Sequence, residues 1–274
     1  NVGVLNVHMY RPWSAKHFLD AMPETVKKVA VLDKTREEGA SGMPLFLDVN
    51  VTYSDAGQNK VITGAQYGLA SKEFTPAMAK AVFDNLKSEN PKKQYVIGVE
   101  DDVTHTSLPY GEEFCTVPEG TTQCIFWGLG SDGTVGSAKQ AISTIGLNTD
   151  LRTQGHFVYD SHKGDGVTVS HLRFGPQEIK AEYCITNGAD YLSCAHPSYC
   201  YKFEMLEPLK EGGTFVLNSP WDSLEQMNKK LPARLKREIA QKKIKFYNLN
   251  AQSIATEVGL GKRVNMIMLV SKLC

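Results

Sequence analysis

One stretch near the middle of the chain, residues 124–145, constrains the fold more than any other. An apolar run from Cys124 to Trp127 predicts a buried strand, and residues 137–145 have helical periodicity. Glycines between the two let the backbone turn sharply and approach a ligand closely. They alternate with short hydroxyl and carboxyl side chains, in the order Gly128, Gly130, Ser131, Asp132, Gly133, Thr134 and Gly136. A strand, a glycine-rich turn and a helix in this order are typical of an α/β sheet.

The same stretch indicates a phosphate-bearing ligand, because the first amides of a helix have no partner and carry partial positive charge. Gly128, Gly130 and Gly133 match the dinucleotide fingerprint in spacing. Asp160, at the end of the strand-like run 156–160, could then bind a ribose, although it lies later than the usual spacing of about 20 residues. No Gly-Lys-Ser/Thr closes the loop, which excludes a P-loop. The alternative reading is that the glycines only allow tight strand-to-helix packing.

Composition excludes several classes of function. Thirty basic and thirty acidic residues balance, so no net field favours nucleic acid or a membrane surface. No run approaches the roughly 18 apolar residues of a spanning helix, and the first residues lack a signal-peptide pattern, so a cytoplasmic location is expected. The six cysteines contain no CxxC pair. We therefore expect no metal site or iron–sulfur cluster within these residues.

Strands and helices are predicted to alternate twice along the chain, which indicates an α/β fold of two consecutive domains, each a largely parallel sheet flanked by helices. The 274 residues are enough for two ordinary domains. Residues 108–123 contain two prolines, two glycines and little periodicity, so the boundary is predicted there. Residues 2–7 form an apolar run that is expected to be a strand, and residues 45–51 form another, whose type Pro44 and Asp48 obscure. Residues 203–209 are predicted to be helical.

Long stretches of the chain resemble the middle part of pyruvate:ferredoxin (flavodoxin) oxidoreductase, a thiamine- and iron–sulfur-dependent 2-oxoacid oxidoreductase. The matching stretches are VGVLNVHMYRPWS (2–14), VAVLDKTREEGASGMPLFLDV (29–49), ITGAQYGLASKEFTPAMAKAVFDNL (62–86), DDVTHTSLP (101–109), GLGSDGTVGSAKQAI (128–142), HFVYDSHKGDGVTVSHLRFG (156–175), LEPLKEGGTFVLNSPW (206–221) and KIKFYNLNA (243–251). The resemblance implies that residues 1–115 form a transketolase C-terminal-like domain. It implies that residues 122–274 form the gamma-type 2-oxoacid oxidoreductase domain, which binds coenzyme A.

The resemblance also implies a coenzyme A site and assigns no catalytic residue to this segment. The residues expected to bind the coenzyme are Gly130, Ser131, Asp132, Gly133, Thr134, Val135, Lys163, Arg263 and Asn265. Thiamine diphosphate, Mg²⁺ and [4Fe-4S] clusters are expected in parts of the enzyme outside this chain. His171 invites a general-base interpretation, but no nucleophile pattern accompanies it, and a structural hydrogen bond is the favoured interpretation.

Two hypotheses about function follow. In the first, the whole protein oxidatively decarboxylates pyruvate to acetyl-CoA, and this segment positions coenzyme A, scaffolds the thiamine domains and is inactive by itself. Its expected partners are the remaining domains or subunits, ferredoxin or flavodoxin as acceptor, and a second copy in a homodimer. A hydrogenosome-like organelle is the expected location in a eukaryote. In the alternative, the chain is a non-catalytic remnant or assembly module of a related multidomain flavoprotein such as sulfite reductase.

Overall fold

The computed structural model describes residues 2–69, 72–159, 166–261 and 263–273, the last five of these by their backbone alone. The chain divides into two compact units, Asn1–Phe114 and Cys115–Cys274. The division lies within residues 108–123, where the sequence predicts the domain boundary. Among the described residues, no helix combines the length and the apolar character needed to cross a membrane.

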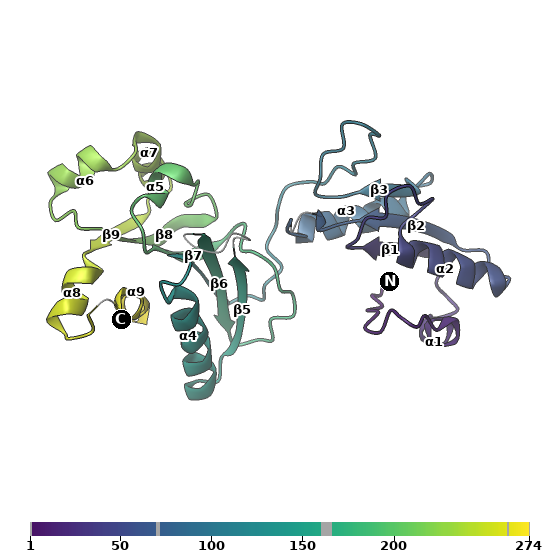
Figure 1. The fold of residues 1–274 in the computed structure, drawn as a ribbon, viewed down its shortest axis with the longest axis horizontal. Helices are drawn as coiled ribbons and strands as arrows, with labels where there is room; N and C mark the ends of the chain where they lie inside the picture. Colours follow the sequence, from purple (N-terminus) through teal and green to yellow (C-terminus); the bar gives the residue numbers. More distant parts are fainter. Residues whose placement is uncertain (1, 70–71, 160–165, 262, 274) are drawn as a thin grey trace. The chain divides into compact units, whose positions relative to one another are not determined.

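The first unit is a three-stranded parallel sheet in the order β1-β2-β3 (Figure 1). Its strands are β1 (Lys28–Asp33), β2 (Val61–Gln66) and β3 (Gln94–Val96). Each connection between successive strands contains a helix, as parallel pairing requires. The helices of this unit are α1 (Ala15–Ala21), α2 (Pro44–Asp55) and α3 (Pro76–Lys87).

Helices α2 and α3 cover opposite faces of this sheet. Phe46 and Tyr53 of α2 pack with Val31 of β1 in one buried cluster. Met78 and Val82 of α3 belong to a second cluster, which takes Ala65 from β2 and Tyr95 from β3. Alternate strand residues therefore point to different helices, as the two-residue period of a strand dictates.

Neither apolar run of this unit is a strand, so the strand expected at residues 2–7 is wrong. Residues 45–51 lie within α2, because Pro44 occupies its first turn and the Asp33 carboxylate caps it. That carboxylate accepts hydrogen bonds from the backbone amides of Leu45 and Phe46, each at 3.1 Å. Residues 2–7 form no regular element, and the Val4 side chain is 88% exposed.

The second unit is a six-stranded mixed sheet in the order β5-β6-β4-β7-β8-β9. Five strands run in one direction, and β6 alone runs against its neighbours β4 and β5. The predicted fold class, two largely parallel sheets flanked by helices, is confirmed. The strands are β4 (Thr122–Leu129), β5 (Arg152–Tyr159), β6 (Val167–Gly175), β7 (Ala189–Cys194), β8 (Leu209–Asn218) and β9 (Lys245–Leu249).

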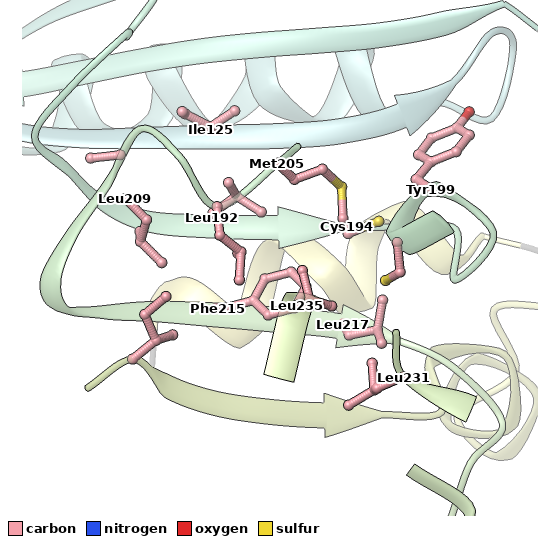
Figure 2. Packing of buried hydrophobic residues seen from close by; sticks show 14 of the residues in the cluster. Ile125, Leu192, Cys194, Tyr199, Met205, Leu209, Phe215, Leu217, Leu231 and Leu235 are labelled. Carbon is pink, nitrogen blue, oxygen red and sulfur yellow. The ribbon is translucent and has the colours of Figure 1, made fainter. Parts of the chain in front are cut away.

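Helices cover both faces of the second sheet. On one face, Phe126 of β4 packs in a buried cluster that includes Ala138 of α4 (Thr134–Asn148), and α4 runs alongside β5 and β6 in Figure 1. The opposite cluster includes Ile125, Leu192 and Phe215 (Figure 2). The remaining helices are α5 (Tyr199–Lys202), α6 (Leu224–Lys230), α7 (Ala233–Gln241), α8 (Ala251–Glu257) and α9 (Val264–Leu273).

The helix predicted at residues 203–209 is wrong. The helix of this region is α5, which ends at Lys202, and residues 205–208 form a turn that leads into β8. Met205 and Leu206 are fully buried in the turn. Pro208 disfavours a helical conformation for the residue before it, so a helix cannot continue to Leu209 without strain.

We expect limited proteolysis to cut first between the two units. No helix or strand is present in residues 108–121, and Glu112 and Phe114 in this segment are exposed. A glutamate-specific protease should cleave at Glu112 and release two fragments that resist further digestion. Replacement of both Glu112 and Glu113 by Gln should delay that cut, whereas Glu24→Gln, an exposed control, should not. A first cut inside either sheet would contradict the boundary.

Candidate functional site

The glycine-rich loop, residues 130–133, lies at the carboxyl end of β4, which is the point where the sheet topology diverges. The chain leaves β4 through α4 toward β5 and β6 on one side, and β7, β8 and β9 lie on the other. Ligands of open α/β sheets bind at this kind of switch point, outside the carboxyl ends of the strands. Topology therefore places the loop where a binding site is expected.

Internal hydrogen bonds hold the loop in one conformation. The Asp132 carboxylate accepts from the backbone amides of Leu129 and Thr134, both at 2.7 Å. The Gly130 amide donates to the Gly166 carbonyl at 2.7 Å. Gly133 has a φ of +87°, a conformation that side chains with a Cβ rarely adopt. These hydrogen bonds fix the loop conformation without a ligand, and the Asp132 carboxylate stabilises it from within.

Two amides at the start of α4 remain open for an anion. The first backbone hydrogen bond of the helix runs from the Ser137 amide to the Gly133 carbonyl, so the amides of residues 134–136 have no acceptor within the helix. The Thr134 amide donates instead to the Asp132 carboxylate. Within the described part of the chain, the amides of Val135 and Gly136 have no partner, and Gly136 is exposed. These two donors, with the positive end of the helix, suit a phosphate.

The structure brings part of the C-terminal segment to this loop. The Asn265 side-chain amide donates to the Gly133 carbonyl at 3.2 Å, and α9 contacts α4. Arg263 lies two residues before Asn265, is exposed, and forms no ion pair with a described residue. The expected site residues 130–135, 263 and 265 therefore share one region, although the sequence separates them by more than a hundred positions.

Two predicted residues lie outside the described part of the chain. They are Lys163, the expected phosphate partner, and Asp160, the ribose-binding acid of the dinucleotide interpretation.

Strand β6 lies between β4 and β5 and runs antiparallel to both. A dinucleotide fold instead pairs its first two strands directly and in parallel.

A buried polar network on β4, β5 and β6 is a feature that sequence reasoning missed. Arg173 is fully buried, and its guanidinium donates to the side-chain carbonyls of Gln123 at 3.1 Å and Gln154 at 2.9 Å. It also lies 4.4 Å from the centre of the Tyr183 ring. Arg173 alternates with His171 along β6, and that alternation is the one signal in the sequence for a shared polar face.

His171 has a structural role in this network. Its Nδ1 accepts a hydrogen bond from the Ile185 amide at 3.1 Å. Burial, with smaller contributions from the charges of His156 and Arg173, lowers the pKa of His171 to about 3. The imidazole is therefore neutral near pH 7, with one nitrogen held by the backbone. This geometry supports the structural interpretation of His171 over the general-base one.

Comparison with known proteins decides the family. The sequence profile described as "Pyruvate ferredoxin/flavodoxin oxidoreductase" matches residues 123–271, which is more than half of the chain. The chain belongs to this family. It is 53% identical to the pyruvate:ferredoxin oxidoreductase of Moorella thermoacetica, over 97% of this chain and 23% of that protein. The resemblance found in the sequence is confirmed.

Further relatives carry related names. The chain is 51% identical to the mitochondrial pyruvate dehydrogenase [NADP(+)] of Euglena gracilis, over 97% of this chain and 15% of that protein. It is 49% identical to the pyruvate-flavodoxin oxidoreductase of Enterobacter agglomerans, over 97% of this chain and 23% of that protein. The chain thus spans less than a quarter of the length of these family members. These relatives do not support the alternative of a sulfite reductase-type remnant.

A solved structure with partial similarity is the pyruvate oxidoreductase subunit PORC of Thermotoga maritima. It aligns with 55% of this chain and 74% of its own, with a TM-score of 0.42 and 16% sequence identity.

Proposed function

We propose that this chain is the coenzyme A-positioning segment of an enzyme that oxidatively decarboxylates pyruvate to acetyl-CoA and passes the electrons to ferredoxin or flavodoxin. The observation that carries the proposal is the pre-built loop after β4, with two open amides at the start of α4. The same family has relatives named for pyruvate oxidation. The thiamine diphosphate, Mg²⁺ and iron–sulfur clusters of the reaction belong to other parts of the protein, so the segment by itself is expected to be inactive.

Each site residue has a distinct task in this proposal. The amides of Val135 and Gly136 donate hydrogen bonds to a phosphate of the coenzyme, and Gly133 allows the backbone to approach it. Asp132 braces the loop, and Asn265 ties the start of α9 to it. The Arg263 guanidinium adds a charge that suits phosphate oxygens, and Lys163, which lies outside the described residues, is expected to add another. None of these groups forms or breaks a covalent bond.

The two units have different roles in the proposal. Residues 122–274 form the coenzyme A-binding domain. Residues 1–115 form a transketolase C-terminal-like domain that scaffolds the thiamine domains. The chain spans only 15% to 23% of the three relatives named above, so the remaining domains or subunits are its first partners, and the complete enzyme is a homodimer.

Calorimetric titration of the 274-residue chain tests the ligand. Coenzyme A should bind, whereas pantetheine, which lacks the phosphates, and NAD should give no measurable heat of binding. Arg263→Gln should weaken coenzyme A about fivefold, equivalent to about 1 kcal/mol for an exposed charge-assisted contact. Arg237→Gln, at an exposed position on α7, is the matched control and should leave the affinity unchanged. Tight NAD binding without coenzyme A binding would instead support the dinucleotide interpretation.

A further inference from the structure

The loop after β7, residues 195–198, lies beside the glycine-rich loop. Strands β4 and β7 are parallel neighbours, paired up to Trp127 and Cys194. The pairing continues one step beyond β7, because the Ala195 amide donates to the Trp127 carbonyl at 2.9 Å. Adjacent strands lie about 5 Å apart. The loop after β7 therefore begins close to Leu129, the last residue of β4.

These two loops lead to helices on opposite faces of the sheet. Ala138 of α4 belongs to the same buried cluster as Phe126 of β4, whereas Tyr199 of α5 belongs to the cluster of Ile125. Successive residues of a strand point to opposite faces. Open α/β sheets bind ligands between two neighbouring loops that diverge in this way. The loop after β7 is thus expected to contribute to the same ligand site as the glycine-rich loop.

Hydrogen bonds to both neighbouring strands hold the loop after β7 in place. The Tyr199 hydroxyl donates to the Gly128 carbonyl at 3.3 Å, at the end of β4. On the other side, the Asn218 side-chain amide of β8 donates to the Ala195 carbonyl at 3.0 Å. The Tyr199 amide donates to the His196 carbonyl at 3.1 Å and closes the turn. The backbone of His196 is therefore fixed next to the start of the glycine-rich loop.

The His196 side chain offers a hydrogen-bond donor to solvent at this position. The residue is exposed, and its ring lies 5.8 Å from the Tyr199 ring. Its Nδ1 lies 3.5 Å from the Ser198 hydroxyl. When that hydroxyl donates to Nδ1, the proton of the neutral imidazole is on Nε2. No described residue is hydrogen bonded to Nε2, so this N–H can meet a ligand.

We propose that His196 is a further coenzyme-binding residue, whose Nε2–H donates to a phosphate oxygen of coenzyme A. The inference rests on the proposed function and adds a contact on the β7 side of the glycine-rich loop. Arg263 serves the other side, because Asn265 ties the start of α9 to the Gly133 carbonyl. Coenzyme A carries a pyrophosphate and a separate phosphate on its ribose. One phosphate can therefore bind the open amides of α4 while another oxygen reaches the imidazole.

Calorimetry of the 274-residue chain with His196 variants tests the contact. His196→Ala should weaken coenzyme A about fivefold, as expected for loss of one exposed hydrogen bond to a charged group. His196→Gln keeps an amide donor near the position of Nε2 and should stay within about twofold of the parent. His8→Ala, at an exposed position in the first unit, is the control and should bind as the parent does. His196→Ala changes a surface residue, so its Tm should shift by less than about 2 °C.

Dephospho-coenzyme A, which lacks the ribose phosphate, shows which phosphate meets His196. If the imidazole contacts the pyrophosphate, His196→Ala should weaken dephospho-coenzyme A by the same factor as coenzyme A. If it contacts the ribose phosphate, the parent and His196→Ala should bind dephospho-coenzyme A equally. Either result supports the contact and names its source.

Chemical protection tests the contact in the unsubstituted chain. Diethyl pyrocarbonate modifies accessible imidazoles, and mass spectrometry follows each one. Coenzyme A should slow the modification of His196 and leave that of His8 unchanged. Absence of coenzyme A binding by the parent would overturn the proposed function and this inference with it. An unprotected His196, an affinity of His196→Ala within about twofold of the parent, or an equal loss in His196→Ala and His196→Gln would overturn the inference alone.

Discussion

Gly133→Val is expected to abolish measurable coenzyme A binding by the chain. Gly133 has a φ of +87°, which a β-branched residue tolerates poorly. A Cβ there would also meet the Asn265 amide nitrogen at 2.9 Å. The loop and the start of α9 must both shift, and the backbone that should approach the phosphate moves with them. Backbone strain of this kind costs about 1–3 kcal/mol, so the second unit should also unfold at lower urea concentration.

Gly212→Val is the matched control, because it introduces the same strain elsewhere in the same unit. Gly212 has a φ of +71°, and a Cβ there would meet nothing within 4 Å. It is in the first half of β8, away from the carboxyl ends of the strands. This variant should lose a similar amount of stability yet retain coenzyme A binding in calorimetry. If both variants lose the ligand equally, or if Gly133→Val retains it, the loop is not the binding site.

The local part of the site could be predicted from the sequence. The run from Cys124 to Trp127 and the periodic residues 137–145 became the centre of β4 and of α4, each extended by a few residues. Glycine spacing also indicated the tight turn between them. These signals work because they depend on residues that are neighbours in the chain. The family resemblance placed Asn265 at the same site, but its hydrogen bond to the Gly133 carbonyl was not predicted.

Long-range contacts explain what the sequence could not predict. The helix at residues 44–55 has no capping side chain at its own N-cap, and its cap is Asp33, at the end of the preceding strand. A capping pattern read within a few residues misses this contact. The direction of β6 was equally hidden, because alternating burial is the same in a parallel and an antiparallel strand. The buried side chain of Arg173 donates hydrogen bonds to Gln123 and Gln154, which come from two other strands.

Acidification from pH 6.5 to pH 5 is expected to destabilise the second unit by about 2 kcal/mol through His171. Its folded-state pKa is about 3, below the unfolded value of about 6.5. Below pH 6.5 the unfolded chain therefore binds a proton that the folded chain excludes, and stability falls by about 1.4 kcal/mol per pH unit. The stability is fully present above pH 6.5 and is lost as the pH falls toward 3. Urea unfolding at several pH values measures the slope.

His171→Asn tests the assignment, since asparagine offers an acceptor oxygen near the position of Nδ1 but does not titrate in this range. The Ile185 amide keeps a partner, so the variant should fold and show a flatter dependence on pH. His8→Asn, at an exposed position in the first unit, should retain the parent slope. The fluorescence of Trp127 and Trp221 in a Trp13→Phe background reports on the second unit alone. If the unfolding free energy of the parent and of His171→Asn depends equally on pH, then His171 contributes nothing to the acid sensitivity, which must come from other groups.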